Sequence, residues 1–266
     1  MRASASIADS ISKYLCLLAL SAATPTHAQT IVHTAAQTDT APKYQSANGA
    51  IVGICVDIDR ALERVAPGLR FAGDQDWIPA SRVDAELTAG RLDSACAISK
   101  TAPRLESLYF IEPPLFSADY VLIARADDAV AIHGWNDVLA LHEAGVVLVD
   151  HGFGPAPRLR SLGVTVDDGA LGVKSNLLKL RAGRARFYFH RVLGLNEEMK
   201  KSGMAGEFRI LPLVMDVQPF YLVFGRHVAP DTLEQARRGV EQLGASGELK
   251  RILRKWGDRA ASGAAP

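Results

Sequence analysis

An arginine directly past a buried strand is the first residue in this sequence that could do chemistry. The apolar run SACAIS, residues 94–99, is followed by Lys-Thr-Ala-Pro-Arg, which ends at Arg104. A planar guanidinium can hold a carboxylate with two parallel hydrogen bonds, and Pro103 limits the backbone beside it. Arg104 can therefore bind an anion, but an arginine at such a position can equally lie on the surface or pair with Glu112.

A glycine-rich loop follows a second apolar strand. The run VVLV, residues 146–149, leads through Asp150 into HGFGPAPR, which places Gly152 and Gly154 close together. Glycines in such a loop let backbone N–H groups face an anion, although a plain strand-to-helix turn has the same composition. The loop is not a phosphate loop of the GxxxxGK[ST] type, because it lacks the lysine and the hydroxyl.

A cationic stretch near residue 190 is the third candidate. Residues 169–196 contain six lysines or arginines and no aspartate or glutamate, and His190 and Arg191 stand together near its end. A guanidinium at this position can meet an anion. The alternative is that Arg191 points to solvent, as charged side chains mostly do.

The sequence gives little support for catalysis. Asp150, Glu112 or His151 could serve as a general acid by residue type, but no spacing of carboxylates or histidine singles one out. No GxSxG is present, and the cysteine spacing fits no zinc site. We therefore expect a binding protein rather than an enzyme, with no cofactor and no metal ion.

The composition and the N-terminus indicate an exported protein. The 266 residues are 48% hydrophobic and carry a formal net charge of +1, so no footprint for nucleic acid or an acidic membrane is visible. Arg2 and Lys13 precede the apolar run 14–23, and Thr26-His27-Ala28 fits a cleavage site before Gln29. The run is far shorter than the ~20 residues of a spanning helix. We expect residues 1–28 to be a signal peptide and the mature chain to be periplasmic.

Two cysteines remain after the signal peptide. Cys55 and Cys96 can pair in an oxidising compartment. They can also be two small buried hydrophobic residues, as free cysteines often are. The sequence leaves both possibilities open.

Strands and helices alternate along the rest of the chain, which predicts an α/β fold with mostly parallel sheets. The pattern restarts near residue 118, so two sheets fit better than one. The expected strands are 30–36, 69–73, 94–99, 118–128, 146–149, 184–191, 208–214 and 220–226. The expected helices are 57–66, 81–90, 135–145, 175–182, 196–203, 231–244 and 246–257.

Four stretches, taken in order, resemble the extracellular solute-binding proteins of family 3, the amino-acid-binding class of ABC importers. VGICVDIDRALE resembles that family's VGFDVDLAKAI, and LTAGRLDSACAISKTAPR resembles its LxxGKxDA…TxTPxR. LYFIEPPLFSADYVLIAR resembles VDFSDPYY…LLV, and LEQARRGVEQLGASGELKRILRKWG resembles the terminal LxxLxxDGxxxxIxxKW. The resemblance covers residues 30–258.

The resemblance implies two lobes that enclose a ligand in a cleft by hinge motion. Lobe 1 would comprise residues 29–117 with 218–266, and lobe 2 residues 118–217, joined by two crossing strands near 115–118 and 217–221. It implies a monomer that binds a small carboxylate-bearing solute and delivers it to an ABC permease. A dehydratase of prephenate or arogenate on the same fold, or a partner of a membrane receptor, is the alternative.

The resemblance also assigns site residues. Arg104 would be the carboxylate clamp, and Arg191 with His190 would stand where the family has an aspartate for the ligand's ammonium. An organic acid, or an anionic or N-blocked amino-acid derivative, should then bind better than a neutral amino acid. The remaining expected ligand-binding residues are Ser99 and Ala97 at the strand end, Trp77 as an aromatic wall in place of Thr40 or Tyr44, and the loop residues Gly152, Phe153 and Gly154.

Overall fold

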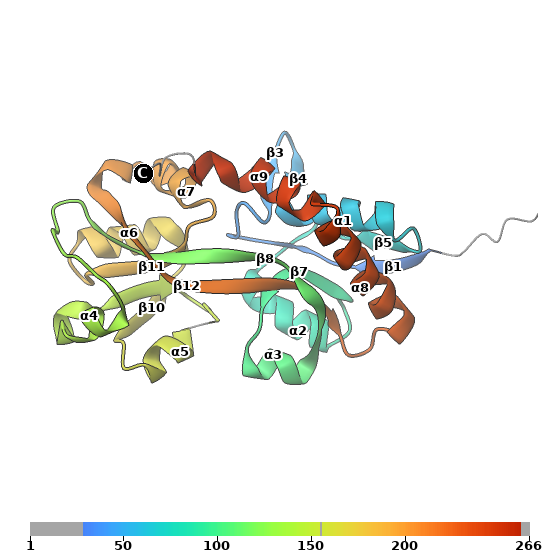
Figure 1. Ribbon diagram of the computed structural model, residues 1–266, viewed down its shortest axis with the longest axis horizontal. Helices are drawn as coiled ribbons and strands as arrows, with labels where there is room; N and C mark the ends of the chain where they lie inside the picture. The colour runs from blue at the N-terminus through green and yellow to red at the C-terminus, as the bar shows by residue number, and fades with distance from the viewer. Residues whose placement is uncertain (1–28, 155, 262–266) are drawn as a thin grey trace, which may run out of the picture.

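The computed structural model describes residues 29–154 and 156–261, with side chains to residue 256. The predicted signal peptide lies outside these residues. Two long strands, β8 (Leu108–Arg125) and β12 (Phe208–Gly225), run antiparallel along the molecule and link its two halves (Figure 1). The sequence predicted only the second part of β8 and two separate strands for β12. The two crossing strands are thus longer than expected.

One half holds the start of the described chain, and the last helix extends from it toward the other half (Figure 1). The strands β1 (Thr30–His33) and β5 (Leu69–Ala72) pair in parallel, and α1 (Ile54–Val65) packs beside them. Helix α1 buries a face at helical spacing, and α8 (Pro230–Ala245) and α9 (Glu248–Ala261) pack against it. The other elements of this half are β2 (Ala36–Gln37), β3 (Gln45–Ala47), β4 (Ala50–Val52), β6 (Trp77–Ile78), a 3₁₀ turn (Ala80–Arg82), α2 (Val83–Thr88), β7 (Ser94–Ser99) and α3 (Ala102–Ser107).

The other half is built on β9 (Val147–Asp150), β10 (Val166–Ala170) and β11 (Phe187–Arg191). These strands extend the sheet in the order β10-β9-β11-β8-β12-β7. Strands β9, β10 and β11 are parallel to one another, whereas β8 and β12 pair antiparallel with their neighbours, so the sheet is mixed rather than mostly parallel. The helices of this half are α4 (Trp135–Leu139), α5 (Ala156–Ser161), α6 (Gly172–Arg181) and α7 (Leu195–Ser202), with 3₁₀ turns at His142–Gly145 and Ala205–Glu207.

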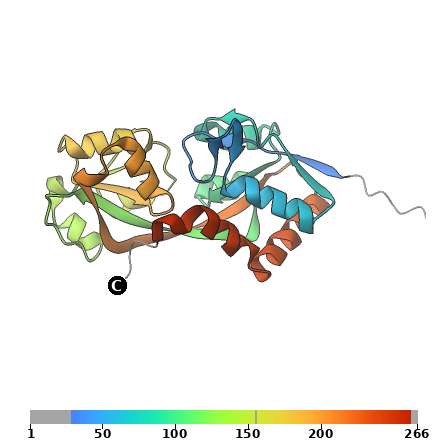
Figure 2. The ribbon, with the colours of Figure 1, turned by 90° about the horizontal axis from the view of Figure 1, so that it is seen from above.

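Each half has its own apolar core. The core of the first half gathers two clusters of buried side chains, one from residues 32–116 and 222–252 and one from residues 83–108 and 221–223. The core of the second half gathers two clusters from residues 118–211. Seen from above, the two bodies lie side by side, and α9 reaches from one toward α7 of the other (Figure 2). Two cores joined by a pair of strands are the arrangement that a hinge requires.

A disulfide joins Cys55, near the start of α1, to Cys96 in β7, with the two Cα atoms 5.7 Å apart. The structure thus resolves the alternative that the sequence left open. The bond ties the first turn of α1 to the strand that ends at Ser99.

No helix within residues 29–154 and 156–261 combines the length and the apolar composition that crossing a membrane requires. In the same part of the chain, no group of three or more histidine, cysteine, aspartate or glutamate side chains is arranged to hold a metal ion.

Candidate functional site

Arg104 lies in α3, five residues past the end of β7, and its guanidinium is oriented by two neighbours. Its Nε donates to both carboxylate oxygens of Asp84, at 3.1 and 2.9 Å, and Nη1 donates to the backbone oxygen and the hydroxyl of Ser99, at 3.1 and 3.3 Å. Glu112, the alternative partner considered from the sequence, pairs with Lys100 instead. Within the described residues, Nη2 of Arg104 has no hydrogen-bond partner, so this edge can meet an anion.

The loop after β9 reaches Arg104 from the other half. A Cβ atom added at Gly154 would lie 3.3 Å from the Ser99 hydroxyl and 3.8 Å from Nη1 of Arg104. Phe153 packs against Tyr120 and Phe189, with ring centroids 5.4 and 5.8 Å away, and this fixes the loop on its own core. The structure therefore brings the predicted clamp and the predicted loop together across the junction of the two halves.

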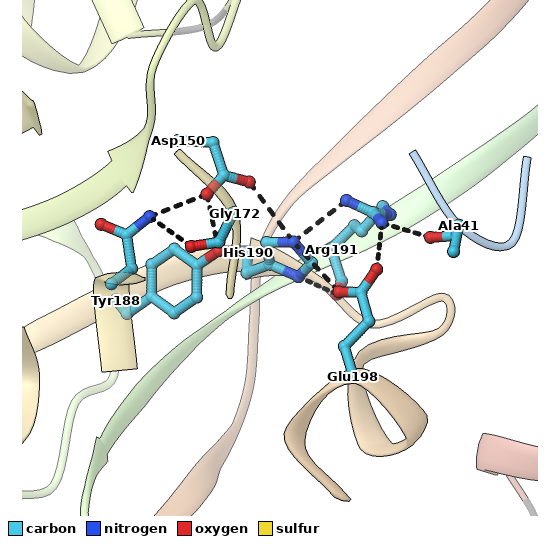
Figure 3. Close-up of polar contacts among 8 residues, drawn as sticks. Ala41, Asp150, Gly172, Tyr188, His190, Arg191 and Glu198 are labelled. Atoms are coloured by element: carbon cyan, nitrogen blue, oxygen red, sulfur yellow. Dashed lines mark hydrogen bonds and ion pairs between the residues drawn. The ribbon is translucent and has the colours of Figure 1, made fainter. Parts of the chain in front are cut away.

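Asp150 ends β9 and stands at the centre of a buried polar network (Figure 3). Its Oδ1 accepts hydrogen bonds from the Tyr188 hydroxyl and from the amide nitrogen of Asn176, both at 2.8 Å. Burial raises the pKa of Asp150 above its ordinary value, although the Tyr188 hydrogen bond and the charge of Arg191 oppose that effect. The network fixes the end of β9 just before the glycine loop.

His190 is 3% exposed and acts within this network rather than at a surface. Its Nδ1 lies 2.8 Å from the backbone oxygen of Arg191, and its Nε2 lies 3.0 Å from Nη1 of Arg191. Burial and the Arg191 charge lower the pKa of His190 well below its ordinary value. A neutral imidazole that donates from Nδ1 and accepts at Nε2 satisfies both contacts.

Arg191 reaches across the junction (Figure 3). Its Nη2 donates to the backbone oxygen of Ala41, in the other half, and to Oε1 of Glu198 at 2.8 Å. Its side chain is 16% exposed. The sequence left open whether Arg191 points to solvent, and the structure places the side chain between the halves.

Glu198 corrects the charge argument made from the sequence. The stretch 169–196 has no acidic residue, but Glu198 follows two positions after its end. Helix α7 places this carboxylate beside Arg191. Burial raises the pKa of Glu198 to about 6, against the opposing charge of Arg191. Its Oε2 is buried without a hydrogen-bond partner among the described residues. Arg191 is therefore paired, and the expectation that it offers an unopposed positive charge was wrong.

Two predicted positions stand apart from this arrangement. Trp77 is 40% exposed at β6, so it is not a core residue, and none of the described contacts joins it to Arg104 or Arg191. Tyr44, the displaced aromatic residue considered from the sequence, is 1% exposed and packs in the apolar core. The role of Trp77 as an aromatic wall stays a prediction.

Sequence reasoning missed Asp84, Glu198 and Lys43 as site residues. Lys43 donates from Nζ to the backbone oxygen of Ala97, at 2.9 Å, and burial together with the charges of Arg191 and Arg104 lowers its pKa to about 7. These residues belong to separate segments, and no spacing in the sequence connects them.

The comparisons with known proteins agree with the fold. The sequence model of the bacterial extracellular solute-binding proteins, family 3, matches residues 32–259. No curated protein matches the sequence.

Solved structures with the same fold cover most of the chain. The substrate-binding protein of an amino-acid ABC transporter is 18% identical, covers 85% of this chain and 99% of its own, and superposes with a TM-score of 0.66. A histidine kinase sensor domain similar to periplasmic binding proteins is 19% identical, with coverages of 86% and 96% and a TM-score of 0.69. The ancestral amino-acid-binding protein AncCDT-1, a precursor of cyclohexadienyl dehydratase, is 15% identical, with coverages of 85% and 95% and a TM-score of 0.66.

Proposed function

Because the chain belongs to the bacterial extracellular solute-binding proteins of family 3, we propose that it binds a small carboxylate-bearing solute between its two halves. In this proposal the mature protein is a periplasmic monomer that delivers the solute to an ABC permease. Residues 29–117 with 218–266 form one lobe and residues 118–217 the other, and the molecule closes on its ligand by hinge motion.

The close approach of the Gly154 loop to Arg104 is the observation that supports the proposal, since a Cβ added at Gly154 would lie 3.8 Å from Nη1 of Arg104. Arg104 is already oriented by Asp84 and Ser99. Its free Nη2 can therefore donate a hydrogen bond to an anion without the side chain having to reorganise. The loop through Gly152 and Gly154 arrives from the other half, and its glycines let backbone N–H groups face a ligand's carboxylate.

A thermal-shift screen followed by calorimetry tests the proposal. The screen should contain neutral, acidic and basic amino acids, dicarboxylates and N-acetylated amino acids. At a ligand concentration of 100 times Kd, binding stabilises the folded state by about 2.7 kcal/mol, which is a readily measured rise in melting temperature. The absence of binding across all carboxylates in the screen, with the protein folded, would overturn the proposal.

An enzyme on this fold is the runner-up, and one feature favours it. Asp150 and Glu198 are half-buried carboxyl groups with raised pKa values, and each approaches Nε2 of His190, at 3.5 and 3.7 Å. Groups of this kind can act as general acids. Both are held by structural partners, however, so the binding function stands first. Incubation with prephenate or arogenate and detection of the aromatic product separates the two.

Export has its own test. The proposal requires a mature chain that begins near Gln29 and carries the Cys55–Cys96 disulfide, since disulfides persist in an oxidising compartment. Mass spectrometry of a periplasmic extract should find both. Recovery of an intact, reduced chain from the cytosol alone would contradict export.

A further inference from the structure

Lys43 is a second cation on the Arg104 side of the junction, and it has an unusual set of partners. Its Nζ donates to Oε1 of Gln37 at 2.8 Å and to the backbone oxygen of Ala97 at 2.9 Å. An ammonium has three donors, and within the described residues the third has no partner. Both acceptors are uncharged.

The backbone of β7 is bent to make this contact. Ala97 has φ = 57°, which is uncommon for a residue with a side chain. Opposite it, the pairing with β12 passes from Tyr221↔Ile98 to Val223↔Ala95, so two residues of β7 face one of β12. This is a β-bulge, a device that redirects groups next to functional sites. It turns the Ala97 carbonyl toward Lys43 rather than into the sheet.

The bulge is held from both sides. Cys96 is joined to Cys55 by the disulfide, and its backbone oxygen lies 3.5 Å from Nε2 of Gln37. The backbone oxygen of Lys43 in turn accepts a hydrogen bond from the Cys55 N–H, at 3.2 Å. A strained backbone that is over-determined in this way is typical of a functional site.

The charges around Lys43 do not neutralise it. The groups whose charges act on it are Arg191, from β11, and Arg104, from α3, and both are positive. Lys100 and Lys179, by contrast, each pair with a carboxylate. Lys43 is half-buried, and a cation withdrawn from water without an anionic partner is costly. Such a position is understandable if the missing anion belongs to the ligand.

We propose that Lys43 is a ligand-binding residue, which pairs with a second anionic group of the solute held by Arg104 and takes up a proton when that solute binds. The inference rests on the proposed function and narrows it to solutes with two anionic groups. It also replaces Arg191, which is paired, as the reason to expect an anionic ligand.

The sign of the pH dependence follows from the free protein. The pKa of Lys43 is lowered to about 7, so part of the population is neutral near neutral pH, and an anion beside Nζ favours the charged form. Binding should therefore take up protons, and more at pH 8 than at pH 7. The association constant should fall by up to about tenfold per pH unit above pH 7, and stay level below pH 6.

Matched acid and amide pairs test the proposal by calorimetry. The probes are L-glutamate with L-glutamine, L-aspartate with L-asparagine, and succinate with succinamate, each titrated at pH 7 and 8 in phosphate and in Tris, which differ in ionisation enthalpy. The proteins are the wild type, Lys43→Met, and Lys250→Met as an exposed control on α9. Thermal unfolding of each protein checks that it is folded.

The wild type and Lys250→Met should bind at least one acid about tenfold or more tightly than its amide, with proton uptake. Lys43→Met should lose the preference and the uptake. Binding of amides as tightly as acids, or of neutral amino acids alone, would overturn the role of Lys43 and leave the proposed function standing. Uptake that persists in folded Lys43→Met would also overturn it. No binding of any carboxylate would overturn both.

Discussion

Arg104 and Arg191 lie on opposite sides of the junction, and their surroundings give the same side chain two different tasks. Arg104 is held at one edge by Asp84 and Ser99, and its Nη2 has no partner among the described residues. Arg191 binds Glu198, His190 and the Ala41 carbonyl. A guanidinium with a free terminal nitrogen can bind a ligand. Arg191 has both terminal nitrogens in hydrogen bonds within the protein, and its buried Nε has no partner among the described residues.

The largest expected effect is the contrast between Arg104→Ala and Arg191→Ala. Removing Arg104 leaves a ligand carboxylate unpaired, which costs about 2–5 kcal/mol, or roughly 30- to 5,000-fold in affinity, with little change in the stability of the ligand-free protein. Removing Arg191 leaves Glu198 buried without its partner. That should cost about 1–3 kcal/mol of stability and affect affinity less.

Calorimetry gives the affinities and urea denaturation gives the stabilities. Arg160→Ala, at an exposed pair with Asp168 in the second half, is the matched control and should change neither quantity by more than about 0.5 kcal/mol. Equal affinity of Arg104→Ala and wild type would remove Arg104 from the site. A loss of ligand affinity in Arg191→Ala without a loss of stability would show that both arginines bind the ligand.

The disulfide gives the second test, because only the half that bears Arg104 is cross-linked. Removing the bond between Cys55 and Cys96, which lie 41 residues apart, should cost about 2–5 kcal/mol of stability. Urea denaturation of wild type and of the double variant Cys55→Ser/Cys96→Ser measures this cost. Dithiothreitol should destabilise wild type and leave the double variant unchanged. Identical midpoints for oxidised and reduced wild type would contradict a stabilising bond.

Much of this contrast was not accessible from the sequence. The alternation of strands and helices and the order of four motifs predicted the fold, and one of these motifs ends at Arg104, the proposed clamp. The first part of β8 was missed because Glu112-Pro113-Pro114 reads as an interruption of a strand.

The charge around Arg191 was predicted wrongly for a different reason. The sequence argument treated residues 169–196 as a unit, but a turn and α7 bring Glu198 back to Arg191. Lys43 and Ala97 are 54 residues apart and meet through a bulge. Neither contact leaves a periodic signal, because periodicity reports which face of an element is buried and not which elements meet at their ends.

The pH dependence of stability in Glu198→Gln tests the pairing of Arg191 with Glu198. Because burial raises the pKa of Glu198 from its ordinary 4.5 to about 6, the folded state holds a proton there that the unfolded chain has released. Wild type should therefore lose stability, relative to Glu198→Gln, as pH rises from 4.5 to 7, by at most about 2 kcal/mol. Urea denaturation of both proteins at four pH values measures the gap. A gap that stays constant, or that moves in favour of wild type, would show that Arg191 outweighs burial.

The smallest expected effect comes from Gly154, where the loop of one half approaches Ser99 and Thr101 of the other. A Cβ at Gly154 would stand 3.3 Å from both the Ser99 hydroxyl and Cγ2 of Thr101, which is closer than side chains normally approach. Gly154→Ala should push the loop from Arg104 by a few tenths of an ångström, and cost about 1 kcal/mol of binding free energy, or roughly fivefold in affinity. Gly206→Ala, where nothing lies within 4 Å, is the control. Calorimetry with the solute found in the thermal-shift screen measures both. If Gly154→Ala binds the solute as tightly as Gly206→Ala does, the loop does not close on Arg104. The affinity for the solute then comes from the half that bears Arg104 alone.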